Sequence, residues 1–292
     1  MKFSEIIKKR KVITVELNPP KGTNTEEALR EISRIKKFID AVNITDCPMA
    51  RLRMSPIALS NIIRQRLAVE TIFNLTCRDR NILGLQAELL GASAMGVENI
   101  LAIYGDPPQI GDHPDARPVY EIDTTGLIGL ARQLNNGLDL AGNKLEKPTN
   151  FFIGTTVNPT AQDLNREITR LQQKVTAGAH FAITQPVYDS AALKIFLEKI
   201  QKINIPIIVG VMPIKSLKFA AYFNKNVPGI TIPQKILEIF EKTPNEDRKK
   251  LGLALTEKFI LENATGVAGF HLMSSPVAEV SQFLEKIKKG LL

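Results

Sequence analysis

Cysteine and histidine are both scarce in this sequence of 292 residues. Only two cysteines, Cys47 and Cys77, are present, which excludes a disulfide framework and is typical of a reducing compartment. The three histidines, His113, His180 and His271, stand at no spacing that a zinc site would use. We therefore expect plain buried thiols, no bound metal and a cytoplasmic location.

Long apolar runs are absent as well. The longest, IPIIVGVMPI at residues 205–214, is too short to cross a bilayer, and the start MKFSEIIKKR has no apolar signal segment. No low-complexity stretch and no linker rich in Pro, Gly or Ser divides the chain. The sequence thus predicts a single domain over residues 1–292 with no membrane association.

Acidic residues are fewer than basic ones, and the formal net charge is +8. The basic residues form no block, and neither an RNP-like aromatic pattern nor a zinc finger is present, so nucleic acid is a poor candidate for a partner. A mild attraction for anions remains. A phosphate-bearing cofactor or a polyanionic small molecule would fit this charge.

What the sequence does contain is an alternation of strand-like and helix-like segments from end to end. Such alternation favours parallel βαβ units, and eight strands close a (β/α)8 barrel, the TIM barrel. The predicted strands are residues 12–17, 42–45, 71–75, 100–103, 151–157, 181–184, 207–211 and 267–272. An additional helix is predicted from Ile232, and a last one from about Pro276.

Polar residues stand at the ends of most predicted strands, and in a barrel these ends meet at one face, where active sites lie. They include Glu16, Asn18, Thr45, Asp46, Asn74, Thr76, Asp106, Thr156, Asn158, Gln185, His271 and Ser274. A single polar residue after a strand is also ordinary turn chemistry, as in the YGDPP stretch that ends at Pro108. The ring of polar residues is a stronger indication of a site than any one member.

Five stretches together resemble the methylenetetrahydrofolate reductase family. They are VITVELNPPKG (12–22), IFNLTCRDRN (72–81), ILAIYGDPP (100–108), KVTAGAHFAITQPVYD (174–189) and GVAGFHLMS (266–274). They occur in the family's order and span nearly the whole chain. In character they are most similar to the reductase half of bacterial fused homocysteine methyltransferase/reductase proteins and to stand-alone reductases of acetogen type.

This resemblance implies a flavin-dependent reductase of one-carbon metabolism and methionine biosynthesis. It would convert 5,10-methylenetetrahydrofolate to 5-methyltetrahydrofolate, with FAD as the first choice of flavin and FMN as the second. The electrons would come from NAD(P)H or from a partner electron-transfer subunit, and the protein would be an oligomer. A non-catalytic or regulatory barrel subunit of a larger complex is the alternative.

The resemblance also implies roles for individual residues. Glu16 would be the general acid, Asp106 would stabilise a cationic iminium, and Gln185 would contact folate and flavin. Tyr188 could stack on a ring of the folate or belong to the core. The residues implied for the flavin site are Thr45, Asn74, Asp106, Tyr120, Arg170, Lys174 and Gln185. The family's arginine beside the strand-four aspartate is replaced here by Tyr104.

Two sets of basic residues have more than one interpretation. Arg166, Arg170 and Lys174 recur every four residues and share a helix face, which is either a solvated surface or, for the last two as the family implies, a contact with cofactor phosphate. Arg78 and Arg80 follow the third strand and could meet cofactor phosphate or cap a loop. Schiff-base chemistry is disfavoured because no lysine lies within a predicted strand.

Overall fold

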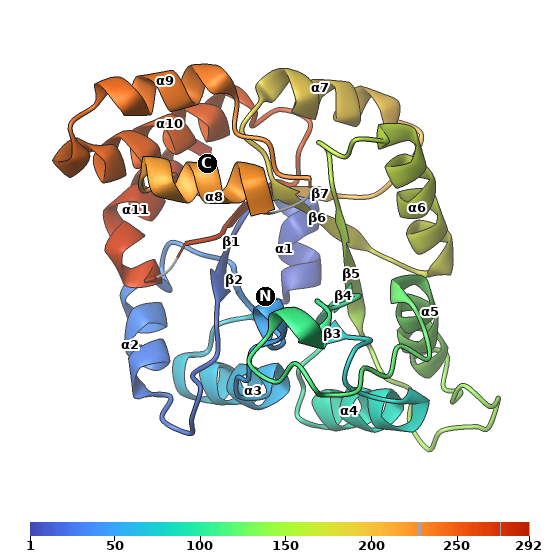
Figure 1. Ribbon diagram of the computed structural model, residues 1–292. Coiled ribbons are helices and arrows are strands. Elements are labelled where there is room, and N and C mark those ends of the chain that lie inside the picture. The colour runs from blue at the N-terminus through green and yellow to red at the C-terminus, as the bar shows by residue number, and fades with distance from the viewer. Residues whose placement is uncertain (227–228, 275, 292) are drawn as a thin grey trace.

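The computed structural model describes residues 1–226, 229–274 and 276–291. Eight parallel strands pair in sequence order and close into one barrel, with helices around its outside (Figure 1). The strands are β1 Val12–Leu17, β2 Ala41–Ile44, β3 Thr71–Thr76, β4 Asn99–Ile103, β5 Phe152–Val157, β6 Phe181–Pro186, β7 Ile207–Val211 and β8 Gly269–Leu272. The predicted TIM barrel is confirmed, and each predicted strand ends within two residues of the observed one.

The helices follow the strands in alternation, apart from one expansion after β7. They are α1 Phe3–Lys9, α2 Glu26–Ile35, α3 Pro56–Leu67, α4 Ile82–Ala94, α5 Thr124–Asn135, α6 Leu164–Ala177, α7 Ser190–Lys199, α8 Leu217–Asn226, α9 Gln234–Lys242, α10 Arg248–Glu262 and α11 Ser281–Leu291. The additional helix predicted from Ile232 is confirmed as α9. Short 3-10 turns lie at η1 Pro48–Ala50, η2 Pro108–Ile110, η3 Asn245–Asp247 and η4 Val277–Val280.

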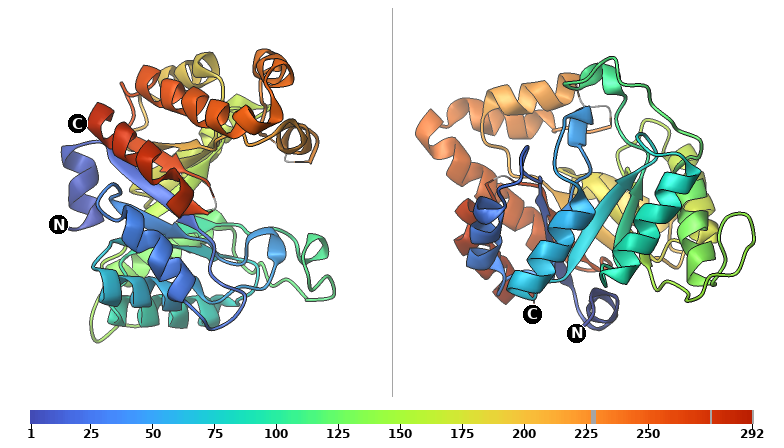
Figure 2. Two further views of the ribbon diagram at one scale, coloured as in Figure 1. Left: turned by 90° about the vertical axis from the view of Figure 1, so that its left-hand side faces the viewer. Right: turned by 90° about the horizontal axis from the view of Figure 1, so that it is seen from below.

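The interior of the barrel is apolar only in its amino-terminal half. Successive strand residues point alternately outward to the helices and inward to the barrel axis. The inward residues of the lower half form one cluster with Phe3 and Ile7 of α1, namely Val12, Ala41, Ile72, Leu101, Phe181, Ile183 and Ile208. Gly154 leaves room there, because a Cβ at this position would lie 2.3 Å from the Phe181 ring. Helix α1 thereby closes this end of the barrel (Figure 2).

Above the apolar layer, the inward positions become polar. The strand register places Glu16 of β1 beside Asn43 of β2, and Thr14 of β1 beside His271 of β8. The loops that carry η1 and η2 extend at the end of the barrel opposite α1 (Figure 2). Within the described residues, no helix has the length and apolar character needed to span a membrane.

Phe3→Ala should test whether α1 is part of the core. Phe3 is fully buried, and its ring meets Phe152 and Phe181 edge-on, with centroids 6.1 and 5.8 Å away. Removing a buried aromatic side chain of this kind lowers the free energy of unfolding by about 3–5 kcal/mol. Urea denaturation measures the loss. Leu83→Ala, at a side chain that is 75% exposed, is the matched control and should change stability by less than about 0.5 kcal/mol. Equal effects of the two substitutions would contradict the packing of α1 into the core.

Candidate active site

A polar cavity of about 450 Å³ opens at the carboxyl ends of the strands. This is the size of small-molecule sites and the position of active sites in such barrels. Five of the residues predicted for the site meet here, from five different elements or loops: Glu16, Thr45, Asn74, Asp106 and Gln185. Barrel closure therefore brings together side chains that are up to 169 residues apart in the sequence, between Glu16 and Gln185.

Glu16 carries a carboxyl group that has no partner among the described residues. Glu16 lines the cavity from β1 and is half-buried, and its carboxyl group has no hydrogen bond to any residue that the structure describes. Burial raises its pKa from 4.5 to about 7, since desolvation disfavours the charged form. A carboxylic acid that titrates near neutral pH is suited to donate a proton to a bound ligand.

Two asparagines of the cavity wall carry buried oxygens that have no partner in the described part of the chain. Asn43 and Asn74 both line the cavity, and the Oδ1 atom of each is buried without a hydrogen bond to any described residue. An unsatisfied buried polar atom costs about 1–3 kcal/mol, so a donor on a bound ligand would be favoured here. Sequence reasoning missed Asn43, although it stands two residues before Thr45, and the side-chain period of two in strands was a usable signal.

His271 contributes a neutral group to the floor of the cavity. Its Nδ1 lies 2.8 Å from the Thr14 hydroxyl, and the side chain is almost completely buried. Burial lowers its pKa to about 3, so the imidazole carries no charge at neutral pH. It supplies a polar contact without adding positive charge beside Glu16.

A second carboxylate, Asp46, is compensated by its neighbours. Its Oδ2 accepts hydrogen bonds from the backbone N–H and the hydroxyl of Thr76, both at 3.0 Å, and from Arg80 at 2.9 Å. The side chains of Asp46 and Arg80 are 2% and 19% exposed. The contacts of Arg80 thus follow the loop-capping alternative, since it pairs with protein in this structure.

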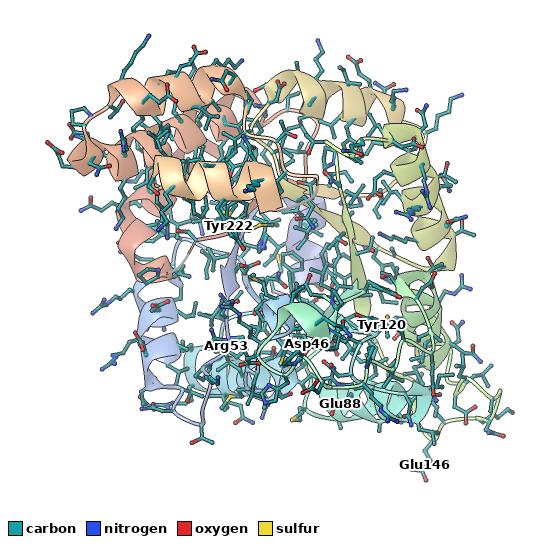
Figure 3. The ribbon with its side chains drawn as sticks, in the orientation of Figure 1. Asp46, Arg53, Glu88, Tyr120, Glu146 and Tyr222 are labelled. Atoms are coloured by element: carbon teal, nitrogen blue, oxygen red, sulfur yellow. The ribbon has the colours of Figure 1, made fainter. Side chains whose placement is uncertain are left out.

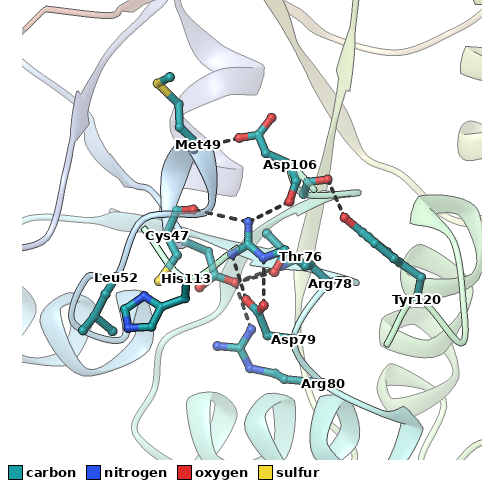
Figure 4. A network of polar contacts seen from close by, with 12 residues as sticks. Cys47, Met49, Leu52, Thr76, Arg78, Asp79, Arg80, Asp106, His113 and Tyr120 are labelled. Atoms are coloured by element: carbon teal, nitrogen blue, oxygen red, sulfur yellow. Dashed lines mark hydrogen bonds and ion pairs between the residues drawn. The ribbon is translucent and has the colours of Figure 1, made fainter. Parts of the chain in front are cut away.

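Asp106 lies at the rim of the same cavity and is exposed. Its Oδ2 accepts a hydrogen bond of 2.8 Å from the Met49 N–H in the loop after β2. Arg78 donates to the backbone carbonyl of Asp106 at 3.2 Å. Figure 4 shows these contacts converging on the carboxyl ends of β2, β3 and β4.

Tyr104 and Tyr120 form an aromatic pair beside Asp106. Their rings are stacked, with centroids 4.4 Å apart and planes 10° from parallel. The Tyr120 hydroxyl donates to the Gly105 carbonyl at 3.1 Å, which fixes the pair to the loop after β4. Tyr104 lines the cavity and is 52% exposed, so one ring face is available to a planar ligand.

Four predicted site residues lie outside the cavity lining: Tyr120, described above, and Lys174, Arg170 and Tyr188. The Lys174 ammonium donates to the carbonyl of Thr156, a lining residue, at 2.8 Å, and burial lowers its pKa. Arg170 is exposed, 3.9 Å from Glu167. Tyr188 lines a small separate cavity under α9 and α10, and its hydroxyl donates to the Met212 carbonyl. Its role toward folate stays a prediction, which these contacts do not favour.

The described residues contain no group of three or more His, Cys, Asp or Glu side chains arranged to hold a metal ion. The fold and the site together define a (β/α)8-barrel protein with a cavity of the active-site type at the carboxyl ends of its strands. A family profile described as methylenetetrahydrofolate reductase matches residues 2–285. The chain belongs to this family, as its five sequence motifs predicted.

Individual relatives have the same family name. A "5,10-methylenetetrahydrofolate reductase" of Pectobacterium carotovorum subsp. carotovorum is 25% identical over 276 residues, which are 92% of this chain and 87% of the relative. A "Probable methylenetetrahydrofolate reductase (NADH)" of rice, Oryza sativa subsp. japonica, is 26% identical over 288 residues. That match covers 90% of this chain but 46% of the rice protein, so the chain spans about half the length of this relative.

A solved structure supports the fold. It is described as "Uncharacterized protein from Clostridium thermocellum binds two copies of 5-methyl-5,6,7,8-tetrahydrofolic acid" and has a TM-score of 0.65 with 21% sequence identity. The match covers 98% of both chains. At this identity the likeness concerns the barrel architecture.

Glu16→Gln should change how stability depends on pH. The folded state binds the Glu16 proton more tightly than the unfolded chain does, so wild-type stability should fall as pH rises from about 4.5 through 7. Glutamine does not ionise, so the variant should not lose stability in this way as the pH rises. We expect the variant to match the wild type near pH 4.5 and to exceed it by about 3 kcal/mol above pH 8, from the shift of the pKa.

Urea denaturation of the ligand-free protein at pH 5, 7 and 8.5 measures this effect. Glu146→Gln is the matched control, because Glu146 is exposed at the far edge of the molecule, away from Asp46 and the cavity (Figure 3). Its stability should follow the wild type at every pH. A pH-independent difference between Glu16→Gln and the wild type would contradict the raised pKa of Glu16.

Proposed function

We propose that this chain is a flavin-dependent reductase that converts 5,10-methylenetetrahydrofolate to 5-methyltetrahydrofolate. The observation that carries the proposal is Glu16, a carboxyl of pKa about 7 in the cavity of a member of this family. The reaction needs a proton donor that is protonated at physiological pH. Glu16 has that property, and Asp106 and Gln185 lie on the same cavity.

The cavity suits a flavin on the donor and acceptor groups it offers. Flavin is a planar ring system with both N–H and carbonyl groups on one edge. The unpaired Oδ1 atoms of Asn43 and Asn74 would accept from such an edge, with Thr45 and Gln185 nearby on the cavity wall. Lys174, at the Thr156 carbonyl, would meet the phosphate. Bound flavin would supply the hydride, and FAD is our first choice.

Glu16 would start the reaction on the folate. The substrate's methylene carbon bridges N5 and N10 in a five-membered ring and cannot accept a hydride until that ring opens. A proton given by Glu16 to N10 breaks the bond from carbon to N10 and leaves an iminium ion at N5. Because burial keeps Glu16 neutral up to about pH 7, the proton is available under ordinary conditions.

Asp106 would stabilise the cation that ring opening creates. One of its oxygens, Oδ2, already accepts from Met49, and Oδ1 has no hydrogen bond within the described residues. Two unit charges about 4 Å apart at an effective dielectric constant near 20 attract by about 4 kcal/mol. A contribution of this order is large enough to lower the barrier substantially.

The electron source and the assembly are inferred from the family resemblance. NAD(P)H or a partner electron-transfer subunit would reduce the flavin, and the protein would act as an oligomer in the cytoplasm. A non-catalytic barrel subunit is the competing function. The two differ in a direct observable, since only the enzyme has to bind flavin and turn over folate.

Glu16→Gln should separate the reduction of folate from the reduction of the flavin, because only the first needs a proton from Glu16. The purified protein should release a flavin, and the variant should lose roughly 100-fold or more in folate reduction, because general acid catalysis is worth about 10²–10⁴. Oxidation of NADH or NADPH with an artificial acceptor, or reduction of the flavin by a one-electron donor, should change less than about threefold, because it needs no proton at N10. In the wild type, folate reduction should decline above about pH 7 as Glu16 ionises.

Glu146→Gln again serves as the control and should match the wild type in both reactions. Unchanged folate reduction by Glu16→Gln would reject Glu16 as the acid. A colourless protein that binds no added flavin and reduces no folate would favour the non-catalytic subunit.

Asn74→Leu should weaken the binding of flavin and stabilise the flavin-free protein. Removing the unpaired amide is expected to raise the unfolding free energy of the flavin-free protein by about 1 kcal/mol, because a buried polar group loses its desolvation penalty. The same change should reduce the flavin retained after gel filtration. Absorbance of released flavin and urea denaturation measure the two effects. Asn150→Leu, at an exposed position in the other end of the barrel, should leave the flavin content unchanged; equal flavin loss in both variants would contradict the assignment.

A further inference from the structure

The loop after β2 has an unusual backbone next to the cavity. Cys47, Met49 and Ala50 have φ angles of 44°, 54° and 52°, in the left-handed region. Residues with a Cβ rarely adopt this region, and they persist there only where the surroundings hold them. Three such residues within four positions indicate that other parts of the chain hold this loop in place.

Two aspartates of the loop after β4 help to hold the loop after β2 in place. Asp106 accepts the Met49 N–H at 2.8 Å, and Asp112 accepts the Leu52 N–H at 2.9 Å. Asp112 also pairs with Lys21 at 3.0 Å. The two loops touch at Gly111, where an added Cβ would lie 2.0 Å from the Ala50 carbonyl oxygen.

Arg78 joins the same two loops from a third direction. Its side chain is 3% exposed, and its Nη1 donates to the carbonyls of Cys47 at 3.3 Å and Asp106 at 3.2 Å. Asp79 orients the guanidinium through two hydrogen bonds, at 2.7 and 2.8 Å. One buried group therefore connects the loops after β2, β3 and β4 (Figure 4).

Gly105 allows the loop after β4 to approach this arginine. Its φ of +94° lies in a region that L side chains rarely adopt. An added Cβ would come within 3.1 Å of the side chains of Thr76 and Arg78. The glycine before Asp106 thus permits the contact between Arg78 and the Asp106 carbonyl.

We propose that Arg78 is a positioning residue for Asp106, acting together with the loop segment Cys47–Leu52, which contains the three left-handed residues. Arg78 fixes the backbone on both sides of the contact, and the Met49 N–H fixes Oδ2 of the Asp106 carboxylate. The other oxygen, Oδ1, is left for the ligand before the ligand arrives. The role of Asp106 in turnover rests on the proposed function, whereas the proposal that Arg78 holds the loop after β2 in place does not.

The chemistry of the side chain makes arginine specific at this position. A guanidinium has a planar set of five donors, which reaches two carbonyls and both oxygens of Asp79 at once. A lysine ammonium is a compact charge with three donors and cannot span these positions. We therefore expect Arg78→Lys to keep the buried charge and to lose most of the bridging.

The test compares Arg78→Met, Arg78→Lys and Asp106→Asn in the full chain. Amide hydrogen exchange in peptides that cover residues 47–52 should accelerate by about tenfold or more in Arg78→Met, with a smaller increase in Arg78→Lys, because local opening becomes easier. Arg66→Met is the matched control: Arg66 is exposed and pairs with Glu26 on the surface. It should leave this exchange unchanged.

Kinetics and a spectroscopic signal complete the test. Arg78→Met should reduce kcat for folate reduction by roughly 100-fold, as a small misplacement of a reacting group does. The double variant with Asp106→Asn should be no slower than Asp106→Asn alone, because both act on one carboxylate. The absorption spectrum of bound flavin should shift in the same direction in Arg78→Met and Asp106→Asn, and KM for folate should change less than kcat.

Several results would overturn the proposal. If amide hydrogen exchange at residues 47–52 is as slow in both Arg78 variants as in the wild type, Arg78 does not hold the loop in place. Faster exchange with unchanged kcat, in a protein that Asp106→Asn does slow, would reject the positioning role. If Asp106→Asn itself leaves folate reduction unchanged, the assigned role of Asp106 is wrong, and the exchange data alone then decide whether Arg78 holds the loop.

Discussion

Closure of the parallel barrel is the constraint on which the other features depend. It forces alternate residues of every strand to point at one axis, so the composition of those inward positions decides what the interior can do. In this chain the lower positions are apolar and packed around Phe3, whereas the upper positions are polar. The floor of the cavity lies where the apolar inward positions give way to polar ones. Glu16 stands close to this apolar layer and is therefore partly desolvated.

Three carboxyl groups line the same cavity in three different environments. Glu16 has no partner within the described residues, and burial raises its pKa. Asp46 is compensated by Arg80 and Thr76. Asp106 is exposed and has one oxygen fixed by a backbone amide. Groups of one chemical type therefore offer a ligand different contacts, because their surroundings differ, and the proposed reaction uses Glu16 as proton donor and Asp106 as charge stabiliser.

The site also concentrates features that lower the stability of the ligand-free protein. Among the described residues, Asn43 and Asn74 have buried oxygens without partners, and the loop after β2 holds three non-glycine residues in the left-handed region. Such features are common where a site is prepared for a ligand in advance. Here the apolar lower half and the closed strand ladder would provide the stability that offsets them.

The sequence by itself determined the architecture and the identity of the family. Eight buried strands and the helical stripes are local patterns, because the side-chain period of two or 3.6 residues is visible within one segment. The convergence of Glu16, Thr45, Asn74, Asp106 and Gln185 followed once eight strands were counted, since all parallel strands end at one face.

The tertiary structure alone decided the contacts between loops and the charge states. The raised pKa of Glu16 comes from desolvation by neighbours that are distant in sequence. The bridging by Arg78 and the stacking of Tyr104 on Tyr120 depend on loop conformations that have no periodic signal. Tyr188 follows Gln185 by only three residues but lies outside the cavity, because it stands beyond the end of β6, where the chain has no strand periodicity to predict its direction. Strand periodicity specifies which side faces the axis, but only the folded loops specify which groups meet there.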